Sequence, residues 1–439
     1  MRQEATRSRA ARTSLSEVCR ACMPLRIAGF PAAHLAAARF AAARLSFVHV
    51  DPARLLALLL LTALLLSGSA WPDTAAAAEP ARAAKVAEPS GPESRGPLRV
   101  LTARLPLPVK RVLALTCPGL APADLVRYPQ RPGTPEPTRE APPLRTVMVV
   151  DEQGHRSRVR LQEDALLVEP LGDCKPPERI ERPDQIDGGR VSFGTGVIAE
   201  AWLAAATLKY RHGILGDVVT AAELRVTNRQ GNELRYRLPD DAVFEDHWAR
   251  MVVVDGQDAV LVVRTGLNDG AAAALFGLDR TAADASALVP LAQSEPLGAP
   301  NRWLNPVGVG DFDGSGSTGI AVVLTPHAGG SLAVYLRQGA KLVERYRAPG
   351  FSNHEIYSRE LGLSAIIDAN GDGIPDLAVP DATRGALRVV TFARGRFAEL
   401  QHISHESPIV TGIAVQSLGD GRPSLVYALQ DGTLVVATR

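Results

Sequence analysis

The sequence has no excess of charge. Its 48 basic and 47 acidic side chains leave a formal net charge of +1 over 439 residues. A nucleic-acid-binding protein needs a surface dominated by positive charge, so we expect no nucleic-acid partner. Aromatic residues are also scarce, at 5%, whereas there are 38 glycines and 33 prolines. This composition favours a turn-rich β protein with linkers, and the 46% of hydrophobic residues allow a sizeable core.

A hydrophobic run long enough to cross a bilayer as a helix is missing. The almost unbroken apolar run 55–66 covers 12 residues, which is too short. Its length is typical of a secretory signal, with cleavage expected after Ala70 or Ala78 because both follow small residues. We therefore predict an N-terminal extension and signal peptide over 1–78, export to the periplasm or the extracellular space, and no transmembrane span in the mature chain. An uncleaved signal anchor is the alternative.

Cysteine is rare, with four residues in the whole chain. Cys19 and Cys22 precede the apolar run and form a C-x-x-C that has neither a second pair for zinc nor a βαβ context for redox chemistry. Cys117 and Cys174 are the only cysteines after the run. In an oxidising compartment we expect a disulfide between them, and two buried free thiols are the alternative.

Recognisable catalytic signatures are missing as well. No G-x-S-x-G occurs, and the H-E that begins at His354 does not become H-E-x-x-H because position 358 is Ser358. The stretch 314–319 fits G-x-G-x-x-G, but an apolar run follows where a dinucleotide fold needs a helix. We therefore expect no nucleotide. An enzyme is not excluded, because catalytic triads are set by geometry.

What the sequence does contain is an unusual loop at 368–376, which reads D-A-N-G-D-G-I-P-D. Oxygen-bearing side chains at alternate positions, followed by a glycine, are what Ca²⁺ requires of a short loop. The flanking runs S-A-I-I and L-A-V are too short for EF-hand helices and predict strands. The expected calcium ligands are the side chains of Asp368, Asn370, Asp372 and Asp376 and the carbonyl of Ile374. The alternative is an Asx-rich hairpin that needs no metal.

The loop recurs in weaker forms. Positions 311–319 keep Asp311, Asp313 and Ser315, so a second and weaker calcium site is expected there. Two further copies, at 251–263 and 414–427, keep fewer acids: Asp255 with Asp258, and Asp420. Each copy is followed by a glycine turn and a second apolar run. The copies start about 50 to 60 residues apart, a spacing typical of propeller blades.

This combination of loop, turn and spacing resembles the integrin-alpha-type β-propeller repeats of bacterial exported proteins, the FG-GAP and VCBS-like group. The resemblance covers about 251–439 well, and its most specific element is the D-x-[DN]-x-D-G-x-x-D loop at 368–376. It implies calcium-stabilised blades. A propeller can close by borrowing a strand from the other end of the domain, so we expect an earlier strand to complete the last blade.

Composition divides the rest of the chain. The stretch 79–97 is Ala, Pro and Glu with little else, and we expect a disordered linker. The region 98–188 has strand-like runs around a Pro-rich loop, and is either a small separate β domain or one or two degenerate blades. For 189–439 we predict an all-β fold, a β-propeller of about 5 to 7 blades with four clear repeats in the C-terminal half of the chain.

Two functions remain open. The first is a non-catalytic binding or scaffold protein that recognises a protein or glycan at the cell envelope. The second is an extracellular polysaccharide hydrolase or lyase with a site on the propeller face, and fold alone cannot decide between them. Two segments that precede Asp loops by the same interval are expected to form one binding patch. These segments contain Trp, Tyr and Arg, the residue types enriched in binding hot spots. The candidate binding residues are Arg302, Trp303, Asn305, His354, Tyr357 and Arg359. The alternative is that Trp303 packs between blades and the arginines form structural ion pairs.

Overall fold

The computed structural model describes residues 96–117, 144–162, 165–172, 174, 179–279, 287–418 and 422–439. These belong to one compact unit, Ala87–Arg439. The expected signal peptide, the C-x-x-C, nearly all of the expected linker and the loop acid Asp420 lie outside the described residues. Those predictions therefore stay predictions.

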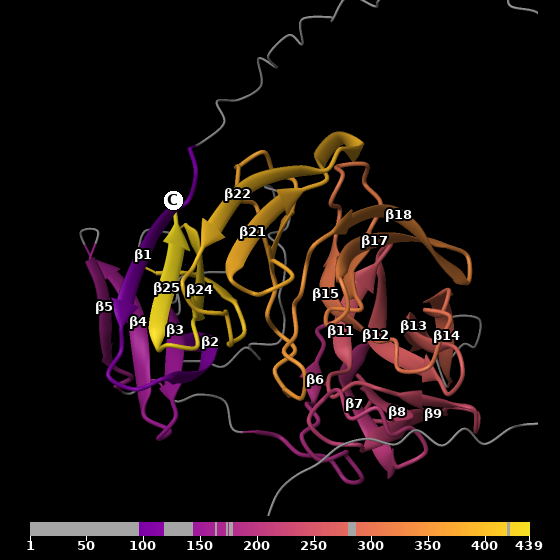
Figure 1. Ribbon diagram of the computed structural model, residues 1–439. Coiled ribbons are helices and arrows are strands. Elements are labelled where there is room, and N and C mark those ends of the chain that lie inside the picture. Colours follow the sequence, from indigo (N-terminus) through magenta and orange to yellow (C-terminus); the bar gives the residue numbers. More distant parts are fainter. Residues whose placement is uncertain are drawn as a thin grey trace, which may run out of the picture. The chain divides into compact units, whose positions relative to one another are not determined.

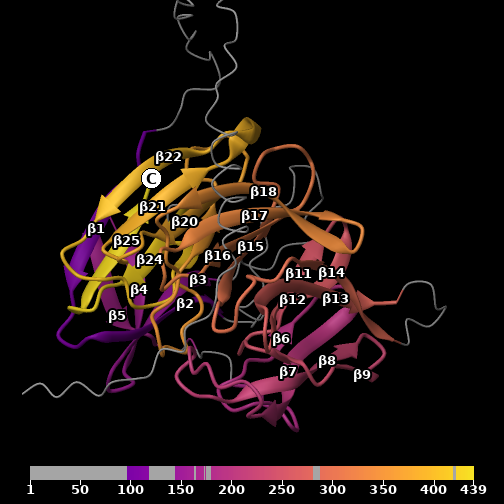
Figure 2. The same cartoon turned by 45° about the vertical axis from the view of Figure 1, so that its right-hand side comes forward.

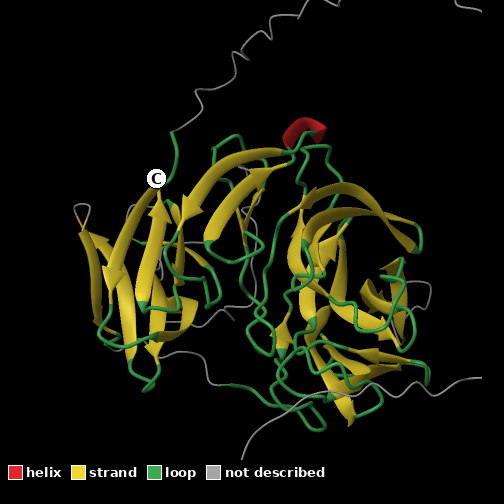
Figure 3. Ribbon diagram, viewed as in Figure 1, coloured by secondary structure: helices red, strands yellow, loops and turns green. Residues whose placement is uncertain are grey.

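The predicted all-β class is confirmed. The described residues form 25 strands and a single short 3₁₀ turn, η1 (Ala393–Gly395), and contain no α-helix. Figure 3 shows how completely strands dominate the fold. Across the same residues no helix is long and apolar enough to cross a membrane.

Twenty-four of the 25 strands fall into six sets of four antiparallel neighbours (6 × 4 = 24), and β10 (Ala242–Phe244) remains. In chain order the first set is β2 (Val109–Cys117), β3 (Leu144–Asp151), β4 (Arg156–Gln162) and β5 (Ala165–Pro170). The second is β6 (Ser192–Phe193), β7 (Ile198–Thr207), β8 (Thr220–Asn228) and β9 (Glu233–Arg237). The third is β11 (Arg250–Val254), β12 (Gln257–Gly266), β13 (Gly270–Leu278) and β14 (Leu288–Ser294).

The fourth and fifth sets contain the two best Asp loops. They are β15 (Leu304–Gly310), β16 (Gly319–Leu324), β17 (Ser331–Gln338) and β18 (Lys341–Pro349), then β19 (Ala365–Ile367), β20 (Asp376–Pro380), β21 (Ala386–Thr391) and β22 (Ala398–Ser404). In both sets the Asp loop joins the first strand to the second. The predicted strand–loop–strand units are therefore present.

The sixth set is completed from the other end of the unit. It contains β23 (Ala414–Ser417), β24 (Pro423–Ala428) and β25 (Thr433–Thr438). Its fourth strand is β1 (Arg99–Arg104), which pairs antiparallel with β25 from Arg99 opposite Thr438 to Arg104 opposite Thr433. Figure 1 shows β1 beside β25. The prediction that an earlier strand completes the last repeat is confirmed.

The hydrophobic core lies between neighbouring sets. Five apolar clusters each join two sets: the first to the sixth, the sixth to the fifth, the fifth to the fourth, the fourth to the third, and the third to the second. Figures 1 and 2 both show β21 and β22 between β17 and β18 on one side and β24 and β25 on the other. No cluster among the described residues joins the first set to the second.

Central strands are apolar on both faces because they pack against two neighbours. Every residue of β13, G-A-A-A-A-L-F-G-L, is buried, whereas β9 alternates between exposed and partly buried positions.

Two hydrogen-bonded links turn the second, third and fourth sets into one curled 13-stranded sheet: β10 pairs with β8 and β12, and β14 pairs parallel with β18. The described strands within 98–188 belong to the same compact unit as the later ones: β1 pairs with β25, and the first set packs on the sixth.

Candidate functional site

The two segments predicted to form a binding patch lie against each other. The rings of Trp303 and His354 are 4.8 Å apart, edge to face. The Asn305 side-chain amide donates to the carbonyl oxygens of Asn353 and Leu361, both at 3.1 Å. The segment before β15 and the segment before β19 are therefore neighbours at one end of the fourth and fifth sets.

Most of this contact region is buried rather than exposed. Trp303, Asn305 and His354 are exposed by only 2%, 0% and 1%. The Trp303 indole donates to the backbone carbonyl of Glu245 at 2.9 Å, so it ties the fourth set to the third. These three side chains therefore pack between sets.

The other three predicted binding residues lie nearer the surface. Tyr357 is 68% exposed, and Arg302 is also exposed. Arg359 forms ion pairs with Asp187 at 3.0 Å and Asp217 at 2.5 Å. The six residues thus divide into a buried core and separate surface positions.

Beside this region lies a pocket of about 220 Å³. Three connections enclose it: the one between β16 and β17, the segment before β19, and the one between β20 and β21. It is lined by Pro326, His327, Gly329, Ser352, His354, Glu355, Ile356, Ala382, Thr383 and Arg384. Close backbone packing fixes its wall, because the amides of Gly350 and Phe351 both donate to the Gly330 carbonyl. A Cβ at Gly330 would lie 1.8 Å from the Phe351 carbonyl oxygen, so this position requires glycine.

A hydrogen-bonded pair of histidines lies in the pocket wall. His354 Nε2 is 2.9 Å from the Ser358 carbonyl oxygen, which can only accept, so this nitrogen carries the hydrogen. In a neutral imidazole the other nitrogen, Nδ1, is then an acceptor, and it lies 3.0 Å from Nε2 of His327. His327 Nε2 therefore donates. The Nδ1 of His327 is left as a bare acceptor on an exposed ring.

Both rings are held in the neutral form. Burial lowers the pKa of His354 to about 3, and partial burial against Trp303 and His354 lowers the pKa of His327 to about 4. Stacking of His327 on Trp303, with the two rings 5° from parallel, adds an apolar neighbour. A base with so low a pKa accepts hydrogen bonds at neutral pH but is weak in proton abstraction, which works best with a pKa near the working pH.

The pocket also contains one carboxylate and one guanidinium, and they are paired. Nη2 of Arg384 donates to Glu355 Oε1 at 3.2 Å, and Nη1 is buried without a partner. Sequence reasoning did not single out Arg384 or His327. Their position in the repeats could have indicated them, because His327 lies just before the glycine turn at Gly330 and Arg384 lies just before the equivalent turn at Gly385 in the next repeat.

The Asp loop at 368–376 is organised by its own oxygens. The two carboxylate oxygens of Asp368 accept from the amides of Gly371 at 2.6 Å and Gly373 at 3.0 Å. Asn370 and Asp372 each accept from the amide two residues later, at 2.8 Å. The loop is therefore curled with its alternate side chains turned towards its own backbone.

Asp376 closes this loop from a buried position. Its Oδ2 accepts from the Ala369 amide at 2.8 Å, it is 0% exposed, and its Oδ1 has no partner. Burial raises the pKa of Asp376 to about 6. A buried carboxylate oxygen without a hydrogen bond is costly, and a cation is one way to satisfy it.

The weaker loop at 311–319 has a similar arrangement. Asp311 Oδ2 accepts from the Gly316 amide at 2.8 Å, while its Oδ1 is buried without a partner. Asp313 accepts from the Ser315 amide at 3.0 Å and from the Tyr346 hydroxyl at 2.9 Å. Ser315 accepts from the Ser317 amide at 3.3 Å. In the part of the chain that the structure describes, no group of three or more His, Cys, Asp or Glu side chains could hold a metal. Calcium sites in the two Asp loops would therefore also depend on Asn or Ser side chains and on carbonyl oxygens.

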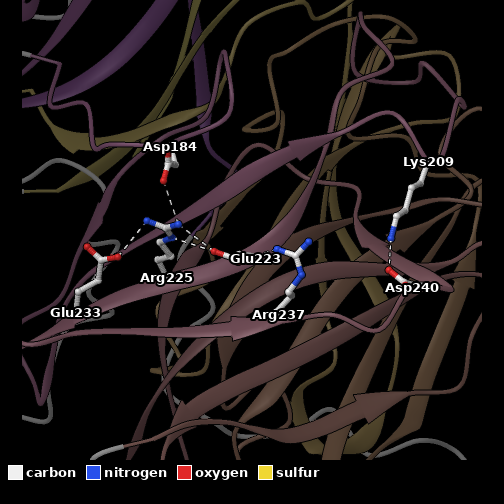
Figure 4. Close-up of polar contacts among 7 residues, drawn as sticks. All are labelled: Asp184, Lys209, Glu223, Arg225, Glu233, Arg237 and Asp240. Atoms are coloured by element: carbon white, nitrogen blue, oxygen red, sulfur yellow. Dashed lines mark hydrogen bonds and ion pairs between the residues drawn. The ribbon is translucent and has the colours of Figure 1, made fainter.

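Other polar clusters are structural. On the β8–β9 hairpin Arg225 contacts Asp184, Glu223 and Glu233 at 3.0–3.2 Å (Figure 4), and Arg237 also contacts Glu223 at 2.9 Å. The charges of this cluster therefore pair with one another.

A buried acid–base pair also lies between the second and third sets. His212 Nδ1 is 2.7 Å from Oε1 of Glu245, and Thr265 donates to Oε2 at 2.9 Å. Burial raises the pKa of Glu245. Both carboxylate oxygens are occupied, and Glu245 is only 2% exposed, so the pair is closed to a ligand.

A second pocket, of about 230 Å³, lies between the β1–β2 connection and β3–β5. Its lining is mainly apolar: Leu105, Pro106, Leu107, Val149, Asp151, His155, Ser157 and Val168. The Asp151 carboxylate is already bonded to His155 and to the Gln153 amide, so this pocket offers less chemistry than the first.

Cys174 is disulfide-bonded and packs near Leu115, Met148 and Leu171. Cys117 ends β2 two residues after Leu115, but its side chain lies outside the described residues. The specific pair Cys117–Cys174 stays a prediction.

Comparison with known proteins adds no family: no family model matches the chain, and no curated protein matches it.

Proposed function

We propose that this chain is an exported, non-catalytic binding or scaffold protein that recognises a protein or glycan at the cell envelope through the pocket formed by His327, His354 and Arg384. Export is supported by the apolar run 55–66 and by the disulfide bond of Cys174, since disulfides persist in oxidising compartments.

The proposed scaffold is a β-propeller of six blades. Six four-stranded sets, five shared apolar clusters and completion of the sixth set by β1 support it. Closure requires the first set to meet the second, and a crystal structure that shows those two sets apart would refute it.

The proposed scaffold also holds calcium. Asp368, Asn370, Asp372, Asp376 and the Ile374 carbonyl would ligate one ion, and Asp311, Asp313 and Ser315 would contribute to a weaker site. The support is the curled loop geometry and the buried, unpartnered Oδ1 atoms of Asp376 and Asp311. Calcium would supply charge and order to these loops, and no chemical step is assigned to it.

The observation that carries the binding function is the histidine pair. The Ser358 carbonyl fixes the tautomer of His354, and His354 in turn fixes that of His327. The His327 ring is therefore well suited to accept a hydrogen bond and poorly suited to remove a proton. The hydrolase alternative is weaker, because most glycosidases use two carboxyl groups that flank the scissile bond. Among the described residues, Glu355 is the only carboxylate that lines the pocket, and it is paired with Arg384.

Capture of ligand from a cell-envelope fraction tests the proposal. The immobilised mature chain is compared with Ala382→Trp, which places an indole in the pocket from an exposed lining position. The matched control is Ala340→Trp, at an exposed alanine in the turn at the other end of β17. We expect the wild type and the control to capture ligand and Ala382→Trp to lose it. Absent capture, or equal capture by all three, would overturn the proposed function.

A further inference from the structure

We propose that the pocket binds an uncharged sugar residue of a glycan. This inference rests on the proposed function and specifies its ligand, with the charge, hydrogen-bond capacity and size of the pocket as its grounds.

The pocket has no net charge to offer a ligand. Its one guanidinium, on Arg384, and its one carboxylate, on Glu355, are an ion pair at 3.2 Å. The two histidines lie in hydrogen-bonded contact at 3.0 Å, where a second proton would place like charges together. An anionic or cationic ligand would have to break the Glu355–Arg384 pair to gain a charged partner in the pocket.

The unused hydrogen-bonding capacity consists mainly of acceptors. The Nδ1 of His327 is bare, and Ser352 and Thr383 already donate their hydroxyl hydrogens, to the His354 carbonyl and to Asp381. Their oxygens, and that of Glu355, can still accept. Ligand groups that donate from several positions fit this set. Sugar hydroxyls can do so.

The remaining lining is apolar and small. Pro326, Ala382 and the 47% exposed Ile356 provide carbon surface next to the polar groups. A sugar ring presents hydroxyls at its edge and C–H groups on its faces, so it matches such a mixed lining. At about 220 Å³ the pocket is below the roughly 300–1,000 Å³ typical for drug-sized ligands, which favours a single ring.

A folded protein partner fits less well. A stable protein interface buries roughly 800 Å² on each side, and its core depends on aromatic and apolar anchors. Within the part of the chain that the structure describes, the only pocket-lining residue among the exposed large hydrophobic side chains is Ile356. The polar pocket is therefore better matched to a glycan.

Saturation-transfer NMR with defined probes tests the inference. The probes are the methyl glycosides of glucose, galactose, mannose and N-acetylglucosamine, with methyl glucuronoside and methyl galacturonoside as negatively charged counterparts. We expect at least one neutral glycoside to bind the wild type and Ala340→Trp and to lose binding at least tenfold in Ala382→Trp. Each uronoside should bind at least tenfold more weakly than its neutral counterpart.

A charge variant sharpens the test. Glu355→Gln leaves the Arg384 guanidinium without its carboxylate, so the preference should shift at least fivefold towards the uronosides. The inference fails if no neutral glycoside binds the wild type, if the uronosides bind equally well, or if Ala382→Trp binds like Ala340→Trp.

Treatment of the envelope fraction separates this failure from failure of the proposed function. Periodate cleaves the vicinal diols of sugars, so prior treatment should abolish capture by the wild type, while protease treatment should not. Capture that survives periodate but not protease would identify a protein partner, refuting the sugar inference and leaving the binding function intact. Absence of capture from the untreated fraction would refute the binding function itself.

Discussion

Replacement of Asn305 with alanine should cost more stability than any surface change of equal size. Asn305 lies in β15 and is fully buried. Its Oδ1 accepts from the Arg250 guanidinium in β11 at 3.1 Å, and its Nδ2 donates to the carbonyls of Asn353 and Leu361. One amide therefore connects the third, fourth and fifth sets.

The expected magnitude follows from the three partners. Asn305→Ala leaves two buried carbonyls without a donor and the buried Arg250 guanidinium short of an acceptor. At about 1–3 kcal/mol for each buried group left unsatisfied, the free energy of unfolding should fall by at least about 3 kcal/mol.

Urea denaturation of Asn305→Ala and of a matched control measures this loss. The control is Asn232→Ala, at an exposed asparagine in the β8–β9 turn, which should stay within about 0.5 kcal/mol of the wild type. If Asn305→Ala unfolds at the same urea concentration as the control, the side-chain bridge between sets does not stabilise the fold.

Three further predictions concern calcium, pH and the disulfide. If the loop at 368–376 binds Ca²⁺ with a dissociation constant of roughly 10⁻⁴ to 10⁻³ M, 10 mM Ca²⁺ should stabilise the wild type by about 1–3 kcal/mol and raise its melting temperature. If calcium changes the melting temperature of neither the wild type nor Asp372→Ala, the site is absent. The pKa of His354 is about 3 in the folded state and about 6.5 in the unfolded state, so the unfolded state binds more protons below pH 6.5. The contribution of His354 to stability should therefore be complete above about pH 6.5 and fall by about 2 kcal/mol at pH 5. His354→Gln should make the melting temperature less dependent on pH between pH 7 and 5, and an unchanged dependence would contradict the assignment. A Cys117–Cys174 disulfide closes a loop of about 57 residues, so reduction should cost about 4 kcal/mol; a peptide map in which Cys174 pairs with another cysteine would refute this pairing.

The elements that local pattern determines were predictable. The Asp loops carry their own hydrogen bonds, so the loop at 368–376 curls as D-x-N-x-D-G indicates. Counting strands indicated that the last repeat needs a strand from earlier in the chain. The sequence did not indicate that this strand is β1, because pairing across more than 300 residues leaves no local signal.

The pocket was harder to predict. His354 was recognised as part of a polar segment, yet its function in the wall depends on His327, which comes from a different set. Trp303 has the residue type of a binding hot spot, but packing against Glu245 and the histidines buries it. Burial and inter-set contacts are properties of the assembled sheets, and residue type alone does not report them.

The central claim is that the pocket binds without catalysing a reaction. Its most direct test is to incubate the ligand captured from the envelope fraction with substoichiometric protein and to follow its chain length by size-exclusion chromatography with light scattering. The account predicts an unchanged size distribution and no new reducing or unsaturated ends. Progressive shortening by the wild type that is lost in His327→Ala would contradict it and establish the hydrolase or lyase alternative.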